Sequence, residues 1–250
     1  MHELKINIGN KDYNFQHPES YNELSEKQYL EVVKLYFLKK EDIASRDADR
    51  INLLFAMLGG FDAKRKQRKS IYNIINYIIK NEPTLIDELL KLQGFISTDK
   101  TFNTWKIPFI KIDKKHNGPD DKFNSMKFGV FIKADTLASA YFGAKKPERI
   151  LNMLVEVLFN CDDASKLHDI PKFGILYNYL AIRNYLTEKY PAVFPKEKKK
   201  SKNITLGKQN NSWMTIRRQL AGSVLELKNV DNLNLHEVLA DLNQKILNDD

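Results

Sequence analysis

Apolar residues recur at helical spacing through most of this sequence, and this pattern restricts the chain to a mainly helical fold. In the segment SEKQYLEVVKLYF, Tyr29, Val32 and Val33 fall on one helical face. Ser25 and Gln28 have the spacing of a capping box, which predicts that this helix begins directly after Ser25. The same apolar spacing predicts helices around residues 51–58, 71–78, 83–92, 125–143, 147–160, 172–190, 213–220 and 235–246.

The first residues of the chain follow the two-residue period of β-strands instead. Apolar side chains alternate with polar ones on both sides of Gly9-Asn10, at Leu4, Ile6, Ile8, Tyr13 and Phe15. Gly at the first position of a two-residue turn suits a type II′ hairpin. The sequence therefore predicts a small N-terminal β-hairpin.

A second alternating stretch lies in the middle of the chain, at Trp105, Ile107 and Phe109. Pro108 has no N–H to donate, so this strand is expected at a sheet edge or a bulge, where it can add to the N-terminal hairpin. The predicted fold class is therefore mainly α, of the α+β type. It is a multi-helix globule with an N-terminal hairpin, an edge strand and a C-terminal helical pair after a basic linker.

The domain organisation follows from a change in composition near residue 191. The segment PAVFPKEKKKSKNITLGKQNN has two prolines, a lysine run and no usable periodicity. We predict a mostly helical core domain with a small β element over residues 1–195, a basic linker or mobile loop over 196–210, and the helical pair over 211–250. The helix that opens at Pro147 is apolar on nearly all sides, which predicts that it is the central helix of the core.

The composition is that of a globular protein of a reducing compartment. Hydrophobic residues make up 42% of the chain, enough for a packed core. Cys161 is the only cysteine, so no internal disulfide can form. No stretch approaches the roughly 18 consecutive apolar residues of a transmembrane helix. We therefore expect a cytoplasmic protein.

The formal charge of +8 is concentrated in two runs. Residues 64–69 contribute five positive charges and residues 196–202 a net four, so the remaining residues sum to −1. The first run lies at the start of a predicted helix, where cations oppose the helix dipole and do not serve helix stability. A phosphate-binding surface uses such a cluster, and a solvated helix face is the simpler interpretation. The candidate nucleic-acid-binding residues are Lys64, Arg65, Lys66, Arg68 and Lys69.

The segment KIDKKHNGPDDKF, residues 111–123, gathers four possible metal ligands: Asp113, His116, Asp120 and Asp121. Their spacing matches no calcium loop, zinc motif or paired-histidine helix. The Asn-Gly-Pro-Asp sequence within it is typical of a turn. We favour a turn and keep a binding loop or a metal-dependent active site as alternatives; the last of these requires the four side chains to converge in one pocket.

The sequence offers no other catalytic constellation. Cys161 has His168 as a possible base, but Asp162 and Asp163 beside the thiol are expected to raise its pKa and leave it unreactive. No nucleophile elbow, P-loop or dinucleotide fingerprint occurs. We therefore expect a protein without catalytic residues, cofactor or bound metal.

Several motifs together resemble a known group of proteins. In order they are PESYNELSEKQYLEV, WKIPFIKI, HNGPDDKF, FGVFIKADTLASAYF, ERILNMLVEVLF and NSWMTIRRQLAGSVLELKNVDNLNLHEVLADL. This order is similar to that of phage and prophage proteins of Bacteroidota that resemble tail-assembly proteins encoded near the tape-measure protein. The resemblance spans most of the chain and includes no catalytic residue.

The resemblance implies a non-catalytic chaperone or adaptor that binds another tail protein, such as the tape-measure protein, in the cytoplasm of a bacterial host. Amphipathic helices can dock in a partner's groove, so the C-terminal pair is the expected partner-binding element. Its candidate residues are Trp213, Ile216, Leu220, Leu235, Leu239 and Leu242. Alternatively, the pair packs back on the body. The second functional interpretation is a nucleic-acid-associated accessory protein that uses the basic run at 64–69.

Overall fold

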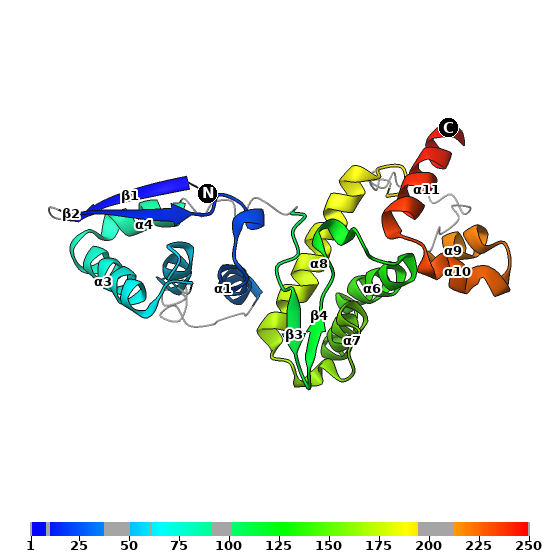
Figure 1. Ribbon diagram of the computed structural model, residues 1–250, viewed down its shortest axis with the longest axis horizontal. Helices are drawn as coiled ribbons and strands as arrows, with labels where there is room; N and C mark the ends of the chain where they lie inside the picture. The colour runs from blue at the N-terminus through cyan, green and yellow to red at the C-terminus, as the bar shows by residue number, and fades with distance from the viewer. Residues whose placement is uncertain are drawn as a thin grey trace. The chain divides into compact units, whose positions relative to one another are not determined.

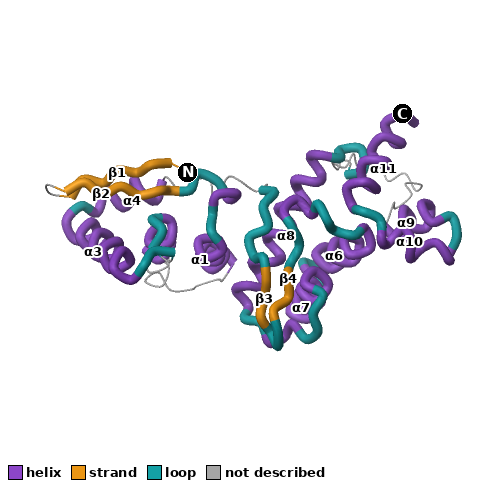
Figure 2. The backbone as a smooth tube through the Cα atoms, viewed as in Figure 1, coloured by secondary structure: helices purple, strands orange, loops and turns teal. Residues whose placement is uncertain are grey.

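The computed structural model describes residues 2–8, 11–37, 51–60, 62–91, 102–194 and 213–249. Over these residues the chain is mainly helical, with two small antiparallel sheets of two strands each (Figure 2). The predicted mainly α fold is confirmed. The chain divides into two compact units: unit 1 contains Met1–Ile107 and His168–Asn178, and unit 2 contains Pro108–Leu167 and Tyr179–Asp250.

Unit 1 begins with the expected hairpin. Strand β1 (His2–Ile8) pairs antiparallel with β2 (Lys11–His17), with Leu4 opposite Phe15 and Ile6 opposite Tyr13 (Figure 1). The alternation places the apolar side chains on one face. The turn residues Gly9 and Asn10, and with them the expected turn type, lie outside the described residues.

Several helical elements follow the hairpin in sequence. These are the 3₁₀ turn η1 (Tyr21–Glu23), α1 (Glu26–Phe37), a helical stretch over residues 51–57, α3 (Arg65–Asn81) and α4 (Pro83–Lys91). The buried core cluster joins one hairpin residue to helical ones: Ile6, Leu54, Leu58, Ile71, Ile74, Ile75, Ile78 and Leu89. The hairpin and α3 thus form one apolar layer of unit 1.

Helix α1 begins where its capping box predicts. The Ser25 backbone N–H donates to Gln28 Oε1 at 2.8 Å, and the Gln28 backbone N–H donates to Ser25 Oγ at 3.3 Å. The expected apolar face is confirmed as well, since Tyr29, Val32 and Val33 are at most 1% exposed. Local sequence therefore specifies both the start and the orientation of this helix.

The rest of unit 1 is formed by residues 102–107 and the first part of α8 (Asp169–Lys189). The Lys106 backbone N–H donates to Asn178 Oδ1 at 2.6 Å, and Asn178 Nδ2 donates to the Thr104 carbonyl at 3.1 Å. The Tyr29 hydroxyl donates to the Gly174 carbonyl at 2.6 Å, which joins α1 to α8. The described part of unit 1 thus gains a second layer from a distant part of the sequence.

Unit 2 is the larger helical body. Its elements are β3 (Phe109–Lys111), β4 (Lys115–Asn117), η2 (Asp121–Phe123), α6 (Phe128–Tyr141), α7 (Pro147–Phe159), η3 (Ala164–Lys166), the second part of α8, α9 (Trp213–Ala221), η4 (Val224–Glu226), α10 (Leu227–Asn232) and α11 (Leu235–Asp249). Helices α6 and α7 pack side by side (Figure 1). The helix predicted around 172–190 is confirmed, and its apolar residues Tyr179, Ile182 and Leu186 are fully buried.

The strand expected over residues 105–109 is wrong in extent and in partner. β3 begins only at Phe109 and pairs with β4, with Ile110 opposite His116. Trp105 Nε1 donates to the Ile107 carbonyl at 2.7 Å, and the Lys106 N–H is taken by Asn178. These side-chain bonds replace the strand ladder at residues 105–107, and within the described sheets the N-terminal hairpin has only its own two strands.

Helix α7 is buried on one side only. It buries Leu151, Leu154, Val155 and Leu158, whereas Met153 on the other side is 39% exposed. The expectation that α7 is the central helix is therefore wrong. Neighbouring elements cover only part of the apolar surface of α7, and single exposed apolar side chains are ordinary on a protein surface.

The predicted domains do not coincide with the two units. The range 1–195 contains parts of both units, the range 196–210 lies outside the described residues, and the described part of 211–250 belongs to unit 2. Among the helices described, none has the length and apolar character needed to cross a membrane.

Candidate functional site

A buried carboxylate holds the start of α9 against the body of unit 2. Asp135 on α6 is 3% exposed and accepts hydrogen bonds from the Tyr179 hydroxyl at 3.2 Å and from Trp213 Nε1 at 2.7 Å. Arg183 Nε also donates to Asp135 and forms an ion pair with it. Burial, followed by the neighbouring Asp135 charge, raises the pKa of Tyr179, so its hydroxyl stays a donor to the carboxylate.

Aromatic packing surrounds the same contact. The Trp213 ring lies edge-on to Phe128, Phe131 and Phe194, with ring centroids 6.0, 5.2 and 5.5 Å away. Edge-to-face pairs of this kind contribute about 0.5–1.5 kcal/mol each beyond the area that they bury. Trp213 is therefore an internal anchor of unit 2.

The segment between α10 and α11 is joined to the residues before α6. The Phe128 N–H donates to the Leu233 carbonyl, and the Leu235 N–H donates to the Met126 carbonyl, each at 2.9 Å. Lys127 and Asn234 form an isolated antiparallel bridge between these two segments. The C-terminal helices thus pack on the body of unit 2, as the alternative interpretation expected.

The predicted partner-binding residues form part of this internal packing. Leu235 and Leu239 are fully buried, and the other four are partly buried: Trp213, Ile216, Leu220 and Leu242. A helical stripe predicts burial against some apolar surface, and here the surface that covers Leu235 and Leu239 belongs to the chain itself. In this arrangement these two leucines are not available to a partner.

The structure exposes other apolar residues of the same region. Val224 and Leu225 in η4, between α9 and α10, are 81% and 89% exposed. Met214 on α9 and Leu233 after α10 are each 46% exposed. Val224 and Leu225 were not predicted from the sequence, although their position after Gly222-Ser223, off the stripe of α9, could have indicated them. We call Val224 and Leu225 the apolar tip.

The four possible metal ligands of residues 111–123 do not converge. His116 Nε2 lies 2.9 Å from Asp113 Oδ1, and this hydrogen bond lowers the pKa of Asp113 to about 2. Asp120 instead accepts from the Ser125 backbone N–H at 2.9 Å, and Asp121 is exposed in η2. No group of three or more His, Cys, Asp or Glu side chains that could hold a metal is present among the described residues.

The 111–123 segment is more ordered than the predicted turn. Residues 109–117 form the β3–β4 hairpin, and only the following Gly-Pro part is irregular. The Gly118 N–H donates to the Pro108 carbonyl at 2.9 Å, which closes the hairpin. The metal-dependent alternative required the four side chains to converge in one pocket, and they do not.

Cys161 has the unreactive environment that its acidic neighbours predicted. The thiol is 8% exposed, and burial is the largest cause of its raised pKa, followed by Glu156, Asp162 and Asp113. The direction of the pKa shift is confirmed, but Asp163 is not among its causes. Burial, Glu156 in the preceding helix and the sequence-distant Asp113 contribute what the adjacent residues could not show.

The basic run lies at the start of α3 and is exposed. All five side chains are exposed, namely Lys64, Arg65, Lys66, Arg68 and Lys69. Like charges at these spacings, such as Arg65 with Lys69, destabilise an isolated helix by about 0.2–0.5 kcal/mol per pair. The cations also oppose the helix dipole. The structure therefore retains a basic cluster that does not serve the stability of α3.

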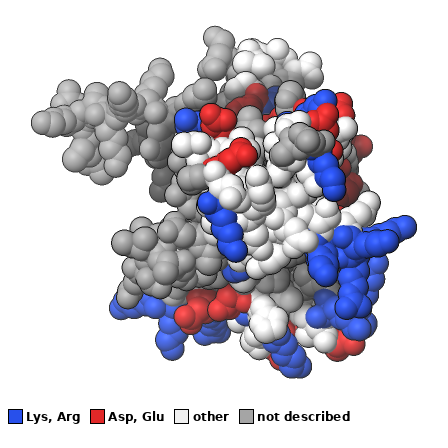
Figure 3. Space-filling view, turned by 90° about the vertical axis from the view of Figure 1, so that its left-hand side faces the viewer, with Lys and Arg blue, Asp and Glu red and all other residues white. Residues whose placement is uncertain are grey.

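Figure 3 views the end of unit 1 that carries the hairpin and α3, and it shows Lys and Arg side chains gathered along the lower part of this face.

Comparisons of the chain with models of protein families, with curated proteins and with solved structures found no match. Two surfaces with different chemistry thus stand out in the described residues: the apolar tip of unit 2 and the basic face of α3.

Proposed function

We propose that the protein is a non-catalytic assembly factor, a chaperone or adaptor that binds another protein of a phage tail. The tail assignment depends on the motifs that resemble tail-assembly proteins of Bacteroidota, with a tape-measure protein as the candidate partner. The observation that carries the binding role is the apolar tip, where Val224 and Leu225 are 81% and 89% exposed.

Contact of two adjacent branched apolar side chains with water is unfavourable, and burial of these side chains against a partner would be favourable. Burying one such side chain fully contributes about 1.5–3 kcal/mol. Single exposed apolar residues are common, but two in succession at the turn between two helices form a continuous contact point. Met214 and Leu233, each 46% exposed, add apolar area on the flanking segments.

The tip is also held on a fixed support. Trp213 ties the start of α9 to Asp135, and Arg217 of α9 forms a bidentate ion pair with Asp231 of α10. Because these contacts fix the two helices on either side of the tip, little conformational entropy remains to be lost on binding. This support favours a preformed docking point over a segment that folds on binding.

The test is affinity capture of tagged protein from its native producing cells, with nuclease treatment and washes at moderate salt. We expect wild type to retain a tape-measure or tail-tube protein, and the double variant Val224→Asp/Leu225→Asp to lose at least 90% of it, because a charge on each side chain blocks apolar contact.

Phe142→Asp is the matched control, since Phe142 is 71% exposed in the same unit but follows α6. All variants should keep wild-type circular dichroism, because the changed side chains are exposed. Equal retention of the tail protein by the tip variant and the control would refute the role of the tip. Absence of any tail protein from the wild-type capture would refute the tail assignment itself.

A further inference from the structure

One line of residues on α3 has a chemistry that the assembly role does not use. Arg65, Lys69, Tyr72, Asn76 and Lys80 follow one another at intervals of four, three, four and four residues. At 3.6 residues per turn these positions share one side of the helix. With a rise of about 1.5 Å per residue, the line is roughly 22 Å long. We call it the α3 stripe.

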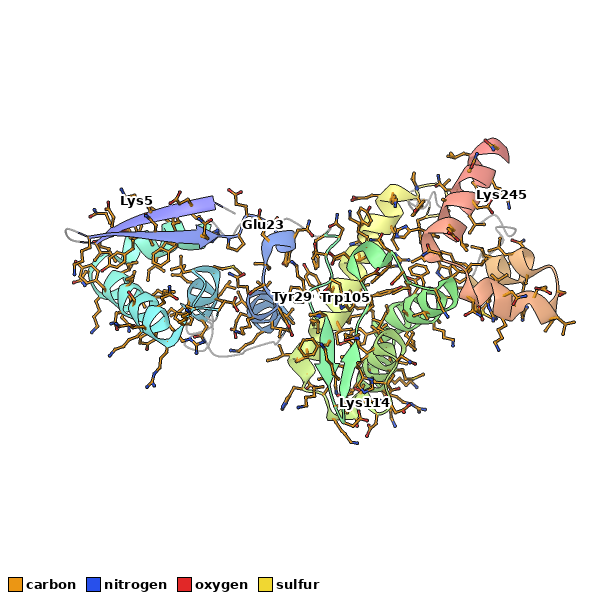
Figure 4. All side chains as sticks on the ribbon, in the orientation of Figure 1. Lys5, Glu23, Tyr29, Trp105, Lys114 and Lys245 are labelled. Atoms are coloured by element: carbon orange, nitrogen blue, oxygen red, sulfur yellow. The ribbon has the colours of Figure 1, made fainter. Side chains whose placement is uncertain are left out.

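The opposite side of α3 fixes the direction in which the stripe faces. Ile71, Ile74, Ile75 and Ile78 are at most 7% exposed and belong to the core cluster that contacts the hairpin. Arg65, Lys69, Tyr72 and Lys80 are exposed. Figure 4 shows nitrogen-tipped side chains that leave α3 on the side away from the hairpin. The stripe therefore faces solvent over most of the helix, and not only at its first turn.

The charge of the stripe is not balanced within the helix. Between Ala63 and Asn81 the sequence has six basic residues and no acidic residue. Elsewhere lysines pair with nearby carboxylates, as Lys5 does with Asp12 at 2.8 Å and Lys245 with Asp241 at 2.7 Å. Among the described residues no such ion pair is formed by Lys64, Arg65, Lys66 or Lys69. The α3 stripe is thus suited to an anionic partner.

Two tyrosines distinguish among anionic partners. Tyr72 lies within the stripe and is 57% exposed, and Tyr77, three residues before Lys80 on the flank of the helix, is 39% exposed. An acidic protein surface needs only the cations, whereas exposed rings between cations are the elements that stack with unpaired bases. The side-chain amides of Asn73 and Asn76 offer hydrogen bonds to bases or sugars next to these rings.

We propose that the α3 stripe binds single-stranded nucleic acid, with the cations on the phosphates and Tyr72 stacked on a base. Arg65 and Lys69 neutralise phosphates near the start of the helix, and Lys80 does so at its far end. This surface belongs to unit 1, and its binding does not depend on the apolar tip or on the proposed role in tail assembly.

Fluorescence anisotropy with labelled 20-nucleotide probes of single-stranded DNA, RNA and duplex DNA tests the proposal over a range of salt concentrations. Wild type should bind the single-stranded probes more tightly than the duplex, with affinity that falls steeply with salt. Each phosphate contact to a single strand contributes about 0.7 to the slope of log affinity against log salt. Arg65→Gln/Lys69→Gln should therefore lower that slope by about 1.4.

Tyr72→Ala separates stacking from charge. This variant should weaken single-strand binding by about tenfold or more, and leave the salt slope and duplex binding unchanged. Lys133→Gln/Lys145→Gln is the matched control, because it removes two exposed lysines of unit 2 and gives the same net charge. It should bind as wild type does.

Four results would overturn the proposal. The first is no binding of any probe at low salt. The second is an equal loss of affinity in Arg65→Gln/Lys69→Gln and in its control. The third is an unchanged affinity of Tyr72→Ala for single strands. The fourth is competition by polyglutamate at the same charge concentration, because this result would point to an acidic protein as the partner.

Discussion

At the scale of single residues, Asp135 connects three helices of unit 2. One carboxylate accepts bonds from Tyr179, Arg183 and Trp213, which lie on two helices other than its own. A buried carboxylate with this many donors is stable only as a complete set, since removal of one member leaves the others without their bonds. Asp135 therefore links the anchoring of α9 to the packing of α6 on α8.

Asp135→Ala is expected to destabilise the protein by about 3 kcal/mol, because it leaves the partly buried Arg183 without its carboxylate. Trp213→Phe should cost less, about 1–2 kcal/mol, because it keeps the ring contacts and removes only one donor. The measurement is the urea midpoint followed by circular dichroism. A midpoint for Asp135→Ala that equals that of wild type would show that the cluster does not hold unit 2 together.

His236 on α11 gives the stability of unit 2 a dependence on pH. The Tyr190 hydroxyl lies 2.8 Å from its Nδ1, and Nε2 lies 2.8 Å from the Lys122 carbonyl, which suits a neutral ring that is protonated on Nε2. Burial lowers the pKa of His236, and the nearby Lys189 and Lys122 charges act in the same direction, while the Lys122 carbonyl and Asp120 oppose them.

Because the folded pKa of His236 lies below the unfolded value of about 6.5, the unfolded chain takes up the proton first as the pH falls. The histidine's contribution to stability is complete above pH 6.5 or so and is lost as the pH falls through the folded pKa. Urea midpoints at pH 7.5, 6.0 and 5.0 should fall less in His236→Gln than in wild type. Parallel pH profiles of the two proteins would contradict this role.

At the scale of elements, close backbone approach decides how α10 lies on α6. A Cβ added at Gly129, the second residue of α6, would lie 2.7 Å from Asp231 Cβ and 3.1 Å from Asp231 Cα. Backbone atoms cannot rotate away as a flexible side chain can, so α10 would have to move. Glycine lowers the intrinsic stability of the helix at this position, but it allows α10 to pack closely on α6.

Gly129→Ala should therefore lower the melting temperature, by an amount that corresponds to about 1–3 kcal/mol of overpacking. Gly143→Ala is the control, because a Cβ there meets nothing within 4 Å. That control should leave the melting temperature unchanged or raise it slightly. A rise in Gly129→Ala equal to that of the control would show that α10 adapts without strain.

Among elements, those with a cap or a long stripe were predictable from the sequence. Ser25 and Gln28 specified the start of α1, and Asn234, whose Oδ1 accepts from the His236 N–H at 2.8 Å, specified the start of α11. The short helix α10 and strand β4 were missed, because six and three residues carry too little periodicity. Their formation depends on contacts with α6 and β3.

At the scale of the whole molecule, local sequence patterns could not predict the division into two units. The boundaries fall at residues 107/108 and 167/168 and within α8, between Asn178 and Tyr179. Neither the 107/108 nor the 167/168 boundary falls in the linker that composition predicted over residues 196–210. Residues 168–178 join unit 1 through contacts such as that of Gly174 with Tyr29, which are 145 positions apart in sequence.

Of the two candidate surfaces, the sequence alone indicated the basic one and missed the apolar one. Charges remain exposed in nearly any fold because desolvation is costly, so Lys64 to Lys69 could be assigned to the surface from their residue types. Apolar residues carry no such information, since either Leu239 or Leu225 could have been the buried one. Tertiary packing covered Leu239 and left Leu225 exposed.

The sequence by itself determined the helices, their caps and the solvent-facing charge, because these depend on residues within one or two turns of each other. Only the tertiary structure decided which apolar faces are buried inside the molecule. Burial depends on contacts such as Trp213 with Asp135, 78 positions apart, which have no signature in a local pattern. The same contacts turned the predicted partner-binding helices into part of unit 2 and left the tip between them exposed.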